Sequence, residues 1–77
     1  MSKDKSIHHN KYKQLGQNIK TRRIAKNLSQ EDLAFEVSSA RNYIGCIERG
    51  EKFPSLAFIF DIARALNCHV QDLFENI

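Results

Sequence analysis

The sequence predicts a small all-α domain built from five helices. Apolar residues recur at spacings of three and four in several short segments, and no segment alternates between apolar and polar residues as a β-strand would. The 77 residues correspond to one domain. Hydrophobic residues make up 42% of the chain and charged residues 27%, which is typical of a globular protein and not of a disordered one.

The first helix is expected to begin near Lys11 and to end at Asn27. Residues 1–10 are polar and charged without periodicity, so we expect a flexible N-terminal arm, followed by a single domain over residues 11–77. The apolar face of this helix consists of Leu15, Ile19 and Ile24.

A second and a third helix follow at short intervals. Ser29 is a favourable N-cap residue, and the two carboxylates soon after it suit the positive end of a helix dipole. The second helix ends near Ser38, and the third covers about residues 40–49, with Gly50 as the residue that ends it. The inward residues of the two helices are Leu33, Ala34, Val37, Ile44 and Ile47.

Two more helices complete the chain. Pro54 and Ser55 open the fourth, and Asn67 can end it by adopting a left-handed backbone conformation. Its apolar residues are Leu56, Ile59, Phe60, Ala63 and Leu66. The apolar residues of the short fifth helix are Val70, Leu73, Phe74 and Ile77.

The second and third helices are the informative pair. They are short, and a connection of about three residues is too tight for them to lie antiparallel. Ala34 is small at the point where they would cross. This pattern is typical of a helix-turn-helix, in which the later helix enters the major groove of DNA.

The outer face of the third helix carries side chains that can read DNA bases. Arg41 can form two parallel hydrogen bonds with a guanine edge, Asn42 can do the same with adenine, and both lie in the first turn. Gly45 costs a helix about 1 kcal/mol relative to alanine, which a close approach of the backbone to the groove would explain. The alternative is a solvated polar face that tolerates a glycine.

Two charged residues fall on apolar faces. Glu48 follows Ile44 by four positions in the third helix, and Arg23 follows Ile19 by four in the first. Because a lone buried carboxylate is costly, we predict that Arg23 and Glu48 pair across the core. The alternative is two separate side chains whose charged ends reach solvent.

These features resemble the lambda-repressor-like, or Xre-type, helix-turn-helix regulators of bacteria and phages. The resemblance covers about residues 15–74. Its motifs are Ser29-Gln30-Glu31-Asp32-Leu33-Ala34, Ile44, Ile47-Glu48-Arg49-Gly50, Pro54-Ser55-Leu56, Ile62-Ala63-Arg64-Ala65-Leu66 and Asp72-Leu73-Phe74. The small size and the tetrad Arg41-Asn42-Tyr43-Ile44 look most like the controller proteins of restriction–modification systems, which are dimers that regulate their own operon. Ser38 departs from the pattern, since the turn usually has Gly or Asn there.

The resemblance implies a role for each residue of the interface. The base-reading positions fall on Arg41, Asn42 and Cys46. The positions implied to contact the DNA backbone are Ser29, Gln30, Arg49 and Lys52, and Gln30 also braces the recognition helix. It further implies the Arg23–Glu48 pair. For Tyr43 two interpretations stay open, a contact along a phosphate and a place beside the core.

Apolar residues of the last two helices exceed what one small core needs, and such surplus surface marks an interface. We therefore expect a two-fold homodimer whose interface contains Phe58, Val70, Leu73, Phe74 and Ile77. In the family this arrangement places two recognition helices about one DNA turn apart, facing a palindromic site. The alternative is that Phe58 and Phe60 only enlarge the core of one chain.

The expected partners are double-stranded DNA, a second copy of the chain and RNA polymerase. We expect no enzyme activity, cofactor, metal site or small-molecule ligand, because no catalytic constellation or metal-type spacing occurs. Neither an apolar leader nor a membrane-spanning run is present, so we expect a cytoplasmic protein with Cys46 and Cys68 reduced. An oxidation switch at Cys46 is a minor alternative. The alternative function is an antitoxin or phage-type repressor whose main partner is a protein toxin.

Overall fold

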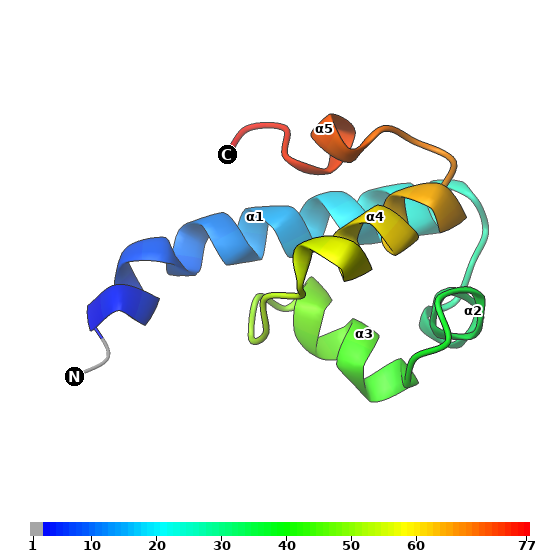
Figure 1. The fold of residues 1–77 in the computed structure, drawn as a ribbon, viewed down its shortest axis with the longest axis horizontal. Helices are drawn as coiled ribbons and strands as arrows, with labels where there is room; N and C mark the ends of the chain where they lie inside the picture. Colours follow the sequence, from blue (N-terminus) through cyan, green and yellow to red (C-terminus); the bar gives the residue numbers. More distant parts are fainter. Residues whose placement is uncertain (1–2) are drawn as a thin grey trace.

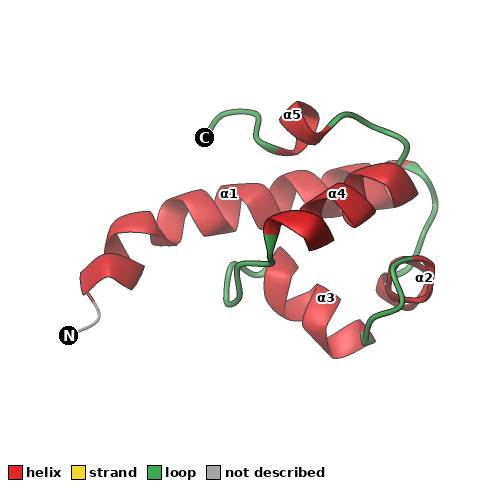
Figure 2. Ribbon diagram, viewed as in Figure 1, coloured by secondary structure: helices red, strands yellow, loops and turns green. Residues whose placement is uncertain are grey.

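The computed structural model describes residues 3–77 of the chain, and these residues fold into five helices. Figure 1 shows their arrangement, and within these residues only loops and turns connect them, with no strand (Figure 2). The helices are α1 (Lys3–Ala25), α2 (Gln30–Glu36), α3 (Arg41–Glu48), α4 (Leu56–Ala65) and α5 (Val70–Leu73). The predicted all-α, five-helix fold is confirmed. None of these helices is long and apolar enough to cross a membrane.

The first helix is longer than the sequence predicted. α1 begins at Lys3, so the expected start at Lys11 is wrong. Residues 3–10 contain neither glycine nor proline, and each residue added to an existing helix gains a backbone hydrogen bond without needing an apolar stripe. In Figure 1 this end of α1 projects beyond the other helices. That residues 1–10 form a flexible arm stays a prediction, and Met1 and Ser2 lie outside the described residues.

All five helices contribute to one hydrophobic core. In Figure 1, α3 and α5 lie on opposite sides of α1, and α4 crosses in front of it. The largest fully buried aliphatic side chains are Leu15, Ile19, Leu33, Ile44, Ile47, Ile59, Ile62 and Leu73. Complete burial of each such side chain stabilises the fold by about 1.5–3 kcal/mol, so this set holds α3 against the other helices.

α1 and α4 each leave some of their apolar residues exposed. On α1 the buried positions include Leu15, Ile19 and Arg23, each four residues after the last, and Ile24 is 53% exposed. On α4 the buried positions begin at Ile59, and both Leu56 and Phe60 are more than half exposed. The assignment of Ile24 to the apolar face of α1 is wrong, because it lies one residue beyond the buried row. The exposure of Phe60 agrees with the expected surplus of apolar surface and not with the alternative in which Phe60 only enlarges the core.

Four helix ends depend on a left-handed backbone. Asn27 (φ 61°) and Asn67 (φ 55°) end α1 and α4 in the conformation that sequence predicted for Asn67. Gly50 (φ 79°) follows α3, and its Cα lies so near α1 that an added Cβ would be 2.9 Å from Lys13 Cα. Ser38 (φ 55°) makes the turn between α2 and α3 without the glycine or asparagine that relieves such strain.

Candidate nucleic-acid interface

The interface begins with a well-capped α2. Ser29 Oγ accepts a hydrogen bond from Asp32 N at 2.9 Å, and Asp32 Oδ2 accepts one from Ser29 N at 2.9 Å. These reciprocal bonds fix the first turn. The hydrogen bonds from Ser29 also hold the pKa of the Asp32 carboxyl below its usual value. The start of α2 is therefore rigid where Gln30 projects.

A short turn then leads into α3. Ser39 N donates to Ala34 O at 2.8 Å, which closes the turn against α2. Ala40 precedes α3 and offers no side-chain cap to it, and Arg41 and Asn42 at the start of the helix are exposed. Ile44 and Ile47 face the core on the other side. The sequence thus places a buried face and a free polar face on the same eight-residue helix.

A buried ion pair ties α3 to α1. Arg23 Nε donates to Glu48 Oε2 at 2.7 Å and Arg23 Nη2 donates to Glu48 Oε1 at 3.1 Å, so the pairing is bidentate. Both residues are only 7% exposed. Arg23 Nη1 also donates to Leu28 O at 2.7 Å. The predicted Arg23–Glu48 pair is confirmed, and it anchors the end of α3 to α1.

Gln30 connects this pair to the exposed face of α3. Its Nε2 donates to Glu48 Oε1 at 3.0 Å, so Gln30 braces α3 as the resemblance implied. Its side chain also lies over Gly45, where an added Cβ would be 3.6 Å from Gln30 Oε1 and 3.1 Å from Arg49 Nη1. Gly45 is buried beneath these side chains. Close approach of the Gly45 backbone to DNA would require the ends of these two side chains to move, and it stays a prediction.

The expected base-reading residues share one surface. A hollow of about 300 Å³ is lined by Gln30, Arg41, Asn42, Gly45, Cys46 and Arg49. Arg41, Asn42 and Arg49 are exposed, and Cys46 is half-buried. We call this surface the α3 face. Hydrogen-bond donors of two guanidinium groups and an amide converge there, which suits base edges and phosphates. The structure thus brings together three of the residues expected to read bases and two expected to bind the backbone.

A second, basic hollow adjoins the α3 face and was not predicted. Its volume is about 420 Å³, and its lining residues are Lys13, Gln17, Lys20, Gln30, Glu48 and Arg49. Glu48 is already paired with Arg23, so Lys13 and Lys20 give this hollow its positive charge. The spacing of Lys13, Gln17 and Lys20 along α1 could have revealed it, since residues four and three apart share a helix face.

Tyr43 and Lys52 flank the α3 face. The Tyr43 ring packs edge-on against Phe58, with centroids 5.4 Å apart and an interplanar angle of 60°. Tyr43 is half-buried, so it lies beside the core, and a phosphate contact from its hydroxyl stays a prediction. Lys52 is exposed in the loop after α3. The adjacent Phe53 stacks on Tyr12 of α1, with centroids 4.9 Å apart, and this contact positions the loop.

The residues expected at a dimer interface fall into three groups. Leu73 is 0% exposed, so it belongs to the core of the single chain and its assignment to an interface is wrong. Phe58, Val70 and Phe74 are half-buried against the same core. Only Ile77 of this group is exposed, at 47%. Leu73 was misassigned because its helical spacing cannot distinguish a core-facing side from a partner-facing side.

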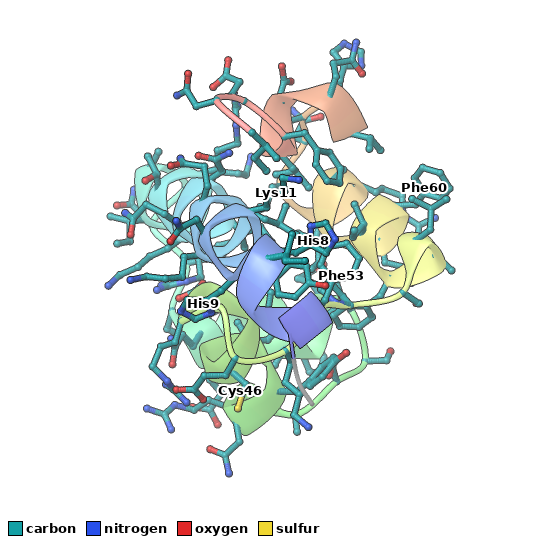
Figure 3. All side chains as sticks on the ribbon, turned by 90° about the vertical axis from the view of Figure 1, so that its left-hand side faces the viewer. His8, His9, Lys11, Cys46, Phe53 and Phe60 are labelled. Carbon is teal, nitrogen blue, oxygen red and sulfur yellow. The ribbon has the colours of Figure 1, made fainter. Side chains whose placement is uncertain are left out.

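The histidines and thiols form no further site in the described residues. Across these residues no three histidine, cysteine, aspartate or glutamate side chains could jointly hold a metal ion. Figure 3 shows His8, His9 and Cys46 pointing in different directions. Both cysteines are free, and burial raises the pKa of the Cys68 thiol.

Comparisons with known proteins agree with this geometry. The family HTH_3, described as helix-turn-helix, matches residues 19–73. Control protein C.BamHI of Bacillus amyloliquefaciens is 44% identical over 61 residues, which is 78% of this chain and 75% of that protein. Control protein C.SmaI of Serratia marcescens is 41% identical over 62 residues, or 80% of this chain and 74% of that protein.

A solved structure shows the same fold. The crystal structure of the restriction–modification controller protein C.AhdI from Aeromonas hydrophila superposes with a TM-score of 0.80 at 41% identity, covering 82% of this chain and 96% of that one. The fold of this chain, the family match across α2 and α3, and the exposed polar α3 face all point to the same family. The chain therefore belongs to the helix-turn-helix family of DNA-binding transcription regulators, and its relatives within that family include the restriction–modification controller proteins.

Proposed function

We propose that the protein is a dimeric, sequence-specific regulator that binds a palindromic operator upstream of its own gene. The convergence of Arg41, Asn42, Gln30 and Arg49 on the α3 face is the observation that carries the proposal. Arg41 and Asn42 read base edges, and Cys46 contacts the base beside them. Bound at this operator, the dimer recruits or blocks RNA polymerase. Its relatives named control proteins support this assignment.

The proposed contacts to the DNA backbone fix the position of the protein on DNA and do not select the DNA sequence. Arg49 and Lys52 are exposed cations at the end of α3 and in the next loop, and Ser29 and Gln30 stand at the start of α2. Contacts of this kind hold the helix in register while carrying no sequence information themselves. Because each neutralised phosphate releases counterions, they also make binding depend on salt.

Fluorescence anisotropy tests the proposal. The wild-type protein is titrated into labelled DNA from upstream of its own gene and into scrambled DNA of the same length, across a series of salt concentrations. We expect a clear preference for the upstream DNA. Loss of a bidentate base contact costs about 1–3 kcal/mol, so Arg41→Ala should lose most of that preference while scrambled DNA binds nearly as before.

Lys52→Ala is the matched control, because it removes an equal charge outside the base-reading positions. It should weaken binding to both DNAs about equally and flatten the salt dependence by about one unit. If the wild type binds both DNAs weakly and equally, the proposed operator is wrong. A protein partner, such as a toxin, then becomes the better hypothesis.

A further inference from the structure

The guanidinium group of Arg49 forms an ion pair with a carboxylate of the same chain. Arg49 Nε donates to Glu51 Oε2 at 2.9 Å, and Arg49 Nη2 donates to Glu51 Oε1 at 3.2 Å. The Nε–Nη2 edge of a guanidinium is one of the edges that grip a phosphate with two parallel hydrogen bonds. The hydrogen bonds between the partners raise the pKa of Arg49 and lower the pKa of Glu51.

This pair sits on the α3 face itself. Arg49 lines both the hollow of the base-reading residues and the basic hollow beside α1. Its Nη2 lies 3.7 Å from Cys46 Sγ. The side chains of Arg49 and Glu51 are 59% and 54% exposed, so solvent reaches both. The cation shared by the two hollows is therefore already paired with a carboxylate of its own chain.

We propose that Glu51 competes with DNA phosphate for Arg49 and thereby sets the affinity of the interface. The inference rests on the proposed DNA binding and deepens it. When DNA binds, phosphate oxygens take the place of the Glu51 carboxylate on the Nε–Nη2 edge, and that carboxylate returns to water. An exposed ion pair is weak, so the exchange is feasible, yet it leaves a negative charge close to the backbone of the DNA.

The competition has a distinctive signature. Phosphates are the same in every sequence, so Glu51→Gln should tighten binding to upstream and to scrambled DNA by the same factor. We expect about two- to tenfold at low salt, with a salt slope steeper by up to about 0.9. The ratio between the two DNAs should not change, because Arg41 and Asn42 set it.

A double-mutant cycle separates competition from simple charge repulsion. The titrations are run for Glu51→Gln, Arg49→Gln and the double variant. If Glu51 acts through Arg49, the gain from Glu51→Gln disappears when Arg49 is already glutamine. An equal gain in both backgrounds would mean that Glu51 only repels DNA, and weaker binding by Glu51→Gln would mean that it braces Arg49. Either result overturns the inference.

Glu75→Gln is the control for net charge. Glu75 follows α5, and α5 lies on the opposite side of α1 from α3 in Figure 1. Glu75→Gln removes the same charge far from the α3 face, so this variant should leave DNA affinity unchanged. Tighter binding by this control, equal to that of Glu51→Gln, would also overturn the inference. Thermal melting of each variant confirms that the fold is kept.

The scrambled DNA keeps this inference separate from the proposed operator. If the wild type shows no preference for its upstream DNA, the operator proposal fails, but the cycle on scrambled DNA still tests Glu51. If the wild type prefers the upstream DNA and Glu51→Gln binds both DNAs with wild-type affinity, only the inference about Glu51 fails. No binding to either DNA at low salt would overturn both.

Discussion

Glu48 is the residue on which three elements depend. It accepts hydrogen bonds from Arg23 of α1 and from Gln30 of α2, and it ends α3. Breaking one side of a buried ion pair leaves an uncompensated charge, so Glu48→Ala should lower the free energy of unfolding by about 3–5 kcal/mol. Urea denaturation of the wild type and of Glu48→Ala measures this loss. A double change of Arg23 and Glu48 to leucine should recover much of the loss, and a Glu48→Ala variant as stable as wild type would contradict the pairing.

Gly16 shows how closely α1 and α3 approach. A Cβ added at Gly16 would collide with Ile47 O and would lie 2.5 Å from Glu48 O, both backbone atoms that cannot move alone. Although alanine favours a helix by about 1 kcal/mol, we expect Gly16→Ala to destabilise the protein by about 1–3 kcal/mol through this overlap.

Gly45 is the matched control for Gly16, since both are glycines within helices. Its added Cβ would meet the ends of Arg49 and Gln30, which are flexible side chains. Gly45→Ala should therefore cost much less than Gly16→Ala in the same urea titration. Equal losses from the two substitutions would mean that backbone overlap is not the cause.

At the scale of elements, the turn between α2 and α3 stores strain at Ser38. A non-glycine residue in the left-handed region costs about 1–2 kcal/mol, and Ser38 has φ 55°. Ser38→Gly should therefore stabilise the protein by about 0.5–1 kcal/mol, measured by thermal melting. Ser39→Gly is the control and should destabilise, because Ser39 has no positive φ to relieve. A Ser38→Gly variant below wild type in stability would contradict this account.

The capping box of α2 predicts a pH dependence. Folding lowers the pKa of Asp32, so its contribution is present above the unfolded value of about 3.9 and is lost as pH falls through the lowered folded value. Asp32→Asn should thus lower the melting temperature at pH 7, and its difference from wild type should shrink in acid below about pH 4. A difference that is constant over this range would show that Asp32 does not cap α2 as a charged group.

Sequence predicts elements best where spacing and end signals agree. Ser29, Asn67 and Gly50 mark their helix ends by local backbone chemistry, and Arg23 with Glu48 was found because two charges fell on apolar faces. The start of α1 was missed because a helix can continue without an apolar stripe. Ile24 and Leu73 were misplaced because an amphipathic pattern does not fix which neighbour covers each face.

The α3 face, too, could be predicted only in part. Its members follow from helical spacing and from the family resemblance, whereas the contacts among them do not. The positions of the Gln30 and Arg49 side chains over Gly45, for example, could not be read from the sequence. The Arg49–Glu51 pair and the basic hollow beside α1 arise from side-chain conformations and from helix packing, which neither composition nor periodicity specifies.

At the scale of the whole molecule, one chain leaves apolar surface uncovered. Leu56 and Phe60, four residues apart on α4, are 59% and 51% exposed, and Ile77 remains exposed at the C-terminal end. Figure 3 shows the Phe60 ring directed away from the rest of the molecule. A domain of this size has a marginal core, so burying such surface against a second copy would stabilise it. This set, with Phe58, replaces Leu73 in the expected dimer interface.

Phe60→Glu tests that interface. Because Phe60 is exposed in the single chain, a charge there should leave the monomer folded but prevent two copies from packing α4 together. We expect the wild type to sediment as a dimer and Phe60→Glu as a monomer in analytical ultracentrifugation, with operator affinity falling accordingly since two half-sites no longer bind together. Phe35→Glu is the control, because Phe35 is 83% exposed on α2 and should leave the dimer intact. A dimeric Phe60→Glu protein would place the interface elsewhere, and a monomeric wild type that still binds its operator would show that a single recognition helix suffices.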